Sequence, residues 1–136
     1  MKKMKAGNLV KTTLVFVAVL FGAMTLFAGI RVLTGADPGY VVFRPLLLYN
    51  TLMGVAYVAA GAIAWRNPAA GMRVAGIIFA LNAAVLLAVV YLYRTGSAVA
   101  IDSVQAMTLR SVVWLVLLAG FAWLSRAARP AAPGQE

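Results

Sequence analysis

Four long apolar segments, separated by short polar stretches, occupy most of the sequence. The clearest is residues 74–93, which has no charged side chain and one strongly polar side chain, Asn82. At about 1.5 Å per residue, a helix of this length reaches roughly 30 Å, the thickness of the hydrocarbon core of a bilayer. Comparable apolar segments at residues 9–33 and 46–65 predict two further transmembrane helices.

The fourth segment needs polar residues to reach the same length. Its purely apolar part, residues 112–124, is too short to span a bilayer alone. Asp102 and Gln105 resemble a capping box, in which the Asp oxygen accepts from an orphan N–H and the Gln side chain bonds back to the cap. A helix over residues 103–126 is then long enough, and it places Arg110 inside its first turns.

The connections between these segments indicate two helical hairpins. Asp37-Pro38-Gly39 has the chemistry of a tight turn, because proline presets φ and glycine tolerates positive φ. A connection of about seven residues between the second and third helices, over residues 66–73, makes these two helices antiparallel neighbours. Residues 130–136, rich in Ala, Pro and Gly, are predicted to form a disordered tail.

Composition identifies the membrane as the solvent of this chain. Its 136 residues allow one domain; 64 % are hydrophobic, 11 % are charged, and the mean hydropathy is +0.94. We therefore predict an all-α integral membrane protein, with a single bundle of four transmembrane helices over residues 1–129. The first segment also resembles a signal peptide, but its apolar run continues to residue 33 without a good cleavage site, so we expect an uncleaved helix.

Charge predicts the orientation. Twelve Lys and Arg against three Asp and Glu give a net charge of +9, which at helix ends fits anionic lipid headgroups rather than nucleic acid. The side of the bundle with both termini carries Lys2, Lys3, Lys5, Lys11, Arg66, Arg73, Arg126 and Arg129. The opposite side carries Arg31, Arg44, Arg94 and Arg110. This excess predicts that both termini lie in the cytoplasm. The small size and the compact basic N-terminus indicate a multi-pass protein of the bacterial inner membrane.

The two hairpins share an order of charged residues. Arg31, Asp37 and Arg44 in the first half correspond to Arg94, Asp102 and Arg110 in the second half. Because both halves run in the same direction, the pattern indicates a parallel internal repeat. The alternative is that membrane hairpins generally have charged ends.

Several kinds of chemistry are excluded by residue types that the sequence lacks. It has no cysteine and no histidine, which removes disulfides, thiolate nucleophiles and the usual ligands of haem, zinc and copper. No acidic side chain lies in the core of a predicted helix, whereas coupled transporters normally keep one there. Without a carboxylate pair or a nucleophile–base pair, we expect no catalysis, no cofactor and no metal.

Small residues recur at every fourth position on two predicted helices, a spacing that lets membrane helices pack closely. They are Gly76, Ala80, Ala84 and Ala88 on one helix, and Ala56 and Ala60 on another. The stripes predict either an interface with a partner subunit or packing within the four-helix unit.

Three polar side chains inside the predicted helices are candidates for a solute pathway. Asn50, Thr51 and Asn82 are predicted to face a common cavity. The competing interpretation of Asn82 is a hydrogen bond to a neighbouring helix, the usual role of a single asparagine in a membrane.

Arg110 is the most informative single residue, because an arginine inside a transmembrane helix is costly. We predict that Arg110 joins Arg44 and Arg94 in an outer-face cluster that binds Asp37, Asp102, or an anionic headgroup or ligand. The alternative is an arginine that extends to the membrane interface and fixes the depth of its helix.

Together these observations favour a small non-catalytic membrane protein. The leading hypothesis is an accessory, assembly or structural subunit of a larger inner-membrane complex, held to its partner through the small-residue helix faces. The alternatives are a homo-oligomeric passive channel or carrier for a small polar or anionic solute, and a lipid- or envelope-binding protein.

Overall fold

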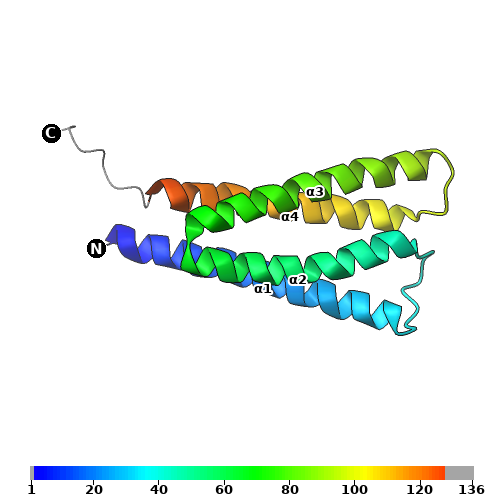
Figure 1. The fold of residues 1–136 in the computed structure, drawn as a ribbon, viewed down its shortest axis with the longest axis horizontal. Coiled ribbons are helices and arrows are strands. Elements are labelled where there is room, and N and C mark those ends of the chain that lie inside the picture. The colour runs from blue at the N-terminus through cyan, green and yellow to red at the C-terminus, as the bar shows by residue number, and fades with distance from the viewer. Residues whose placement is uncertain (1, 128–136) are drawn as a thin grey trace.

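The computed structural model describes residues 2–127 and contains four α-helices in this part of the chain (Figure 1). They are α1 (Lys2–Leu33), α2 (Arg44–Arg66), α3 (Pro68–Arg94) and α4 (Ile101–Ala127). Each helix is long and apolar enough to cross a membrane. The predicted tail at residues 130–136 lies outside the described residues.

The helices form two antiparallel hairpins, α1–α2 and α3–α4, that lie side by side (Figure 1). Residues 34–43 and 95–100 connect the helices of each hairpin at one end of the bundle, which we call the two-loop end. The start of α1, the α2–α3 connection and the end of α4 lie at the opposite end, which we call the terminal end.

The connection between the hairpins is shorter than predicted, because Asn67 alone separates α2 from α3. The Asn67 N–H donates to Ile63 O at 2.8 Å and so caps α2. Its side chain accepts from the N–H groups of Ala69 at 3.1 Å and Ala70 at 3.3 Å, and so also caps α3. Pro68 fits the first position of α3, where its missing N–H costs nothing. The predicted seven-residue connection was therefore wrong.

The two loops show which turn predictions hold. Gly39 N–H donates to the Asp37 carboxylate at 2.8 Å, and Gly39 has a φ of 85°, which confirms the predicted turn chemistry. The predicted capping box was wrong, because α4 begins at Ile101 and Asp102 lies inside the first turn instead of at the cap. A carboxylate there still interacts favourably with the helix dipole.

Backbone contact through glycines holds α1 against α2. A methyl group added to Gly22 would lie 2.8 Å from Gly54 O and 2.8 Å from Val58 N, too close for any atom to fit. A methyl group on Gly54 would in turn meet the backbone of Leu26. Such close approach is how helices associate where lipid provides no hydrophobic drive.

We expect Gly22→Ala to destabilise the protein by about 1–3 kcal/mol, because the new methyl group must push two helix backbones apart. Gly76→Ala is the matched control: its methyl group would meet only Leu118 Cδ1, at 3.7 Å, and alanine favours the helix by about 0.5–1 kcal/mol. Thermal unfolding in detergent measures both variants. Equal melting temperatures for the two would contradict the tight α1–α2 contact.

Aromatic side chains fill the centre of the bundle where the hairpins meet. Tyr57 of α2 and Trp114 of α4 are fully buried, with their ring centroids 4.8 Å apart, and Phe21 of α1 lies 5.7 Å from Tyr57. Large apolar side chains also cover the outside, where Leu52 is 70 % exposed and Leu87 is 72 % exposed. An apolar exterior around a core that contains polar groups is the distribution expected of a protein solvated by lipid.

Candidate binding site around Arg110

A buried hydrogen-bond network joins the two hairpins at mid-height. Asn82 of α3 is fully buried. The Tyr49 hydroxyl donates to Asn82 Oδ1 at 2.8 Å, and Asn82 Nδ2 donates to the Tyr57 hydroxyl at 3.0 Å. Both tyrosines belong to α2, so Asn82 bonds a neighbouring helix, as the competing interpretation of the sequence had it.

Arg110 lies above this network, towards the two-loop end, and its side chain is inside the bundle. Its Nε atom is buried and has no hydrogen-bond partner within the described part of the chain. The titratable side chains that influence its guanidinium are those of Tyr57, Tyr40 and Tyr49.

The structure does not bring the predicted outer-face cluster together around Arg110. Arg44, Arg94, Asp37 and Asp102 are all exposed at the two-loop end, whereas Arg110 is partly buried. Its buried Nε has no hydrogen-bond partner in the described chain and so makes no bond to a loop carboxylate.

Other buried polar atoms near this level also have no hydrogen-bond partner among residues 2–127. They are Asn50 Oδ1, Ser111 Oγ and Trp114 Nε1. Arg110, Ser111 and Trp114 lie within about one turn of α4, and Trp114 packs on Tyr57. Each such group costs about 1–3 kcal/mol when it has no partner, so these atoms mark positions where water or a ligand would be bound.

We call Tyr49, Asn50, Tyr57, Arg110, Ser111 and Trp114 the Arg110 site. Three of its unpaired atoms, on Arg110, Ser111 and Trp114, are hydrogen-bond donors. Arg110 and Trp114 are four residues apart and share one face of α4, and unpaired donors beside a cation favour an anionic or strongly electron-rich group. The sequence analysis did not select four members of this site, Tyr49, Tyr57, Ser111 and Trp114. The available signal was the occurrence of hydroxyl and indole side chains within predicted transmembrane helices.

The predicted grouping of Asn50, Thr51 and Asn82 is not formed. The Thr51 hydroxyl donates to Leu47 O of its own helix at 2.8 Å, and its side chain packs against Gly29 of α1. Thr51 therefore faces the α1–α2 contact, away from α3. Adjacent residues on a helix point about 100° apart, which is why Asn50 and Thr51 have different surroundings.

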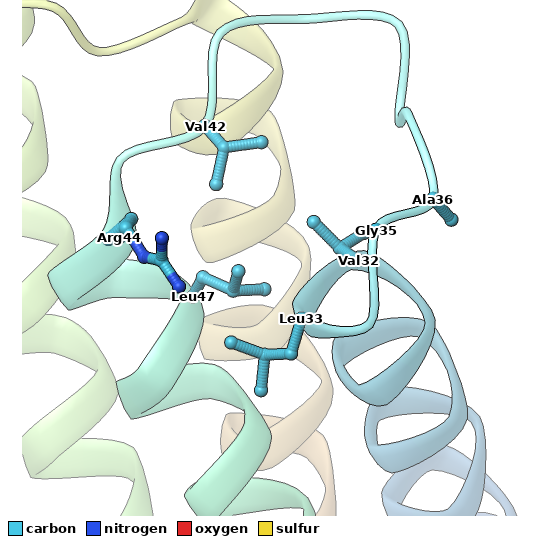
Figure 2. Close-up of a pocket in the computed structure, with 7 residues that line it drawn as sticks. All are labelled: Val32, Leu33, Gly35, Ala36, Val42, Arg44 and Leu47. Atoms are coloured by element: carbon cyan, nitrogen blue, oxygen red, sulfur yellow. The ribbon is translucent and has the colours of Figure 1, made fainter.

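Two adjoining cavities open at the two-loop end. The larger has a volume of about 310 Å³ and is lined by Val32, Leu33, Gly35, Ala36, Val42, Arg44 and Leu47 (Figure 2). The smaller, of about 40 Å³, is lined by Val32, Tyr40, Val42, Phe43, Leu46, Leu47, Asn50 and Ser103. They share Val32, Val42 and Leu47. The smaller cavity thus adjoins the Arg110 site through Asn50, and its Tyr40 wall also acts on Arg110.

The small-residue stripes divide between inside and outside. Ala60 of α2 is buried and Ala56 is partly buried, so this stripe packs within the bundle. On α3, Gly76 is partly buried, whereas Ala80, Ala84 and Ala88 are exposed on the outer surface. Only the α3 stripe is therefore accessible to another chain.

No protein-family model, curated protein or solved structure matches this chain. Within residues 2–127, no group of three His, Cys, Asp or Glu side chains could hold a metal ion. The site is thus described by its own geometry: a buried cation, unpaired donors and a neighbouring pair of cavities.

Proposed function

We propose that this protein is a non-catalytic binding protein of the bacterial inner membrane that holds an anionic group at Arg110. In this proposal both termini are cytoplasmic, so the two-loop end and its cavities lie at the outer face. The positive charges at the terminal end support that orientation. The sequence analysis offered an anionic ligand bound by an outer-face cluster of arginines. The proposal keeps the anionic ligand but assigns its binding to Arg110 within the bundle.

The observation that carries the proposal is the buried Arg110 Nε without a partner. A buried cation needs a counter-charge or strong acceptors, and the titratable side chains that influence Arg110 are those of tyrosines. An anion would accept from Arg110 and from Ser111 or Trp114, and would offset the desolvation of all these donors.

Arg110→Gln tests the proposal, because glutamine keeps hydrogen-bonding capacity and removes the charge. We expect the purified chain, in nanodiscs of neutral lipid, to be stabilised by anions, and the variant to bind them at least about tenfold more weakly, a loss of about 1.4 kcal/mol. Arg94→Gln is the control, because Arg94 is exposed on the same end of the bundle. Equal losses in both variants would refute a specific role for Arg110.

A second candidate function, an accessory subunit of a larger membrane complex, is supported by the outward stripe of α3. Ala80, Ala84 and Ala88 present small side chains to the lipid, next to the exposed Leu87. Such a face allows close contact with a partner helix. Native mass spectrometry from mild detergent distinguishes a constitutive hetero-complex from a homo-oligomer or a monomer.

A further inference from the structure

We infer that the anionic group is the head of an amphiphile, carboxylate or phosphate, that reaches Arg110 from the lipid through the cavities at the two-loop end. This inference rests on the proposed function and names its ligand class. A fully hydrated inorganic anion is the alternative, and the walls of the cavities argue against it.

The larger cavity combines aliphatic side chains, polar backbone groups and one cation. The side chains of Val32, Val42 and Leu47 point into the space between the end of α1 and the start of α2 (Figure 2). Arg44, which is exposed, lies at the side of the same cavity. Apolar walls beside a guanidinium complement a hydrocarbon chain with an anionic head.

The volume of this cavity fits a small organic molecule. At about 310 Å³ it lies at the lower end of the range of ligand pockets, roughly 300–1,000 Å³. A bare anion needs much less space and gains nothing from aliphatic walls, whereas a hydrocarbon chain gains free energy from every methylene that leaves water.

The smaller cavity extends the path towards Arg110. It shares three aliphatic walls with the larger one and ends at Asn50, whose Oδ1 is buried without a partner in the described chain. Its other polar lining residues are Tyr40 and Ser103, and Tyr40 is one of the titratable groups that influence Arg110. In the inferred path a head group meets Arg44 at the larger cavity and Arg110 beyond the smaller cavity, which Arg110 itself does not line.

Residues 34–43 contribute lining residues to both cavities, so movement of this segment would change the passage between them. This segment is anchored by the ends of α1 and α2 and turns at Gly35 and Gly39, which have φ values of 111° and 85°. A methyl group at either glycine would meet nothing within 4 Å. A loop with so few contacts rearranges more easily than a packed helix.

Binding to the chain in phosphatidylcholine nanodiscs tests the inference with four probes: decanoate, decyl phosphate, acetate and decanol. We expect at least one of the two anionic amphiphiles to bind tenfold or more tightly than acetate. Decanol, which has the chain without the charge, should compete at least tenfold more weakly. Arg110→Gln should reduce binding of the amphiphile by at least tenfold.

A pair of tryptophan variants tests the path. Leu47→Trp fills the junction of the two cavities and should weaken amphiphile binding at least tenfold. Leu52→Trp places the same side chain on the lipid-facing surface of the same helix and should leave binding unchanged. The elution volume and circular dichroism of each variant verify folding, and Val42→Phe replaces Leu47→Trp if the latter does not fold.

The outcomes distinguish failure of the amphiphile inference from failure of the proposed anion-binding function. If acetate and decanoate bound equally tightly, and Arg110→Gln weakened the binding of both, the ligand would not be an amphiphile. The proposed anion site at Arg110 would still stand. If Arg110→Gln weakened amphiphile binding but Leu47→Trp did not, the route through the two cavities would be overturned. Binding that is insensitive to Arg110→Gln, or decanol binding equal to that of decanoate, would overturn the inference and the proposed function together.

Discussion

Arg110→Met is expected to stabilise the ligand-free protein while it abolishes anion binding. Methionine is unbranched and slightly shorter, fills most of the same space, and removes a partly buried cation whose Nε has no hydrogen-bond partner in the described chain. Replacing buried charges by apolar side chains of similar volume is often stabilising, by about 1–4 kcal/mol. Thermal unfolding in detergent, with and without a bound anion, measures both effects on the same sample.

The control for this prediction is Arg94→Met, which removes an exposed arginine and should change stability by less than about 0.5 kcal/mol. A lower melting temperature for Arg110→Met than for the wild type would show that Arg110 holds the helices together. The residue would then be a structural element, and the case for a ligand at its guanidinium would fail.

Asn82→Leu is expected to destabilise the protein by about 2–3 kcal/mol. The change removes the hydrogen bonds to Tyr49 and Tyr57, each worth about 0.6–1.7 kcal/mol between membrane helices, and leaves both hydroxyls without that partner. Unfolding by heat or by a denaturing detergent measures the loss.

Ala84→Leu serves as the matched control for Asn82→Leu, because it adds the same side chain to the exposed face of α3. Its effect on the stability of the monomer should be close to zero. If Asn82→Leu were as stable as Ala84→Leu, the network would contribute nothing and α3 would be held by apolar packing alone. Tyr49→Phe, which removes one bond, should fall between the two.

The existence of the four helices could be predicted from the sequence, because length and apolar composition decide whether a segment can span a bilayer. The inward face of each helix could not be predicted in the same way. In α3, buried Ala75 and exposed Ala84 are chemically identical, and lipid accepts the same side chains as the core does. A helix that is hydrophobic all round carries no stripe from which its orientation can be inferred.

The candidate site was only partly predictable for the same reason. Arg110 and Asn82 were identified because their side chains are rare inside transmembrane helices. Their neighbours depend on which helices pack together, and this depends on contacts such as that of Gly22 with Gly54. Charged residues at the two-loop end of both hairpins suggested one surface cluster, although a shift of one or two positions along α4 decides whether a side chain faces out or in.

The single residue between α2 and α3 has a mechanical consequence. Asn67 caps both helices at once, so the two hairpins are joined at the terminal end by a connection of almost no length. A small change in the angle between two rods joined in this way moves their far ends most. Any such change would therefore be largest at the two-loop end, where the cavities lie.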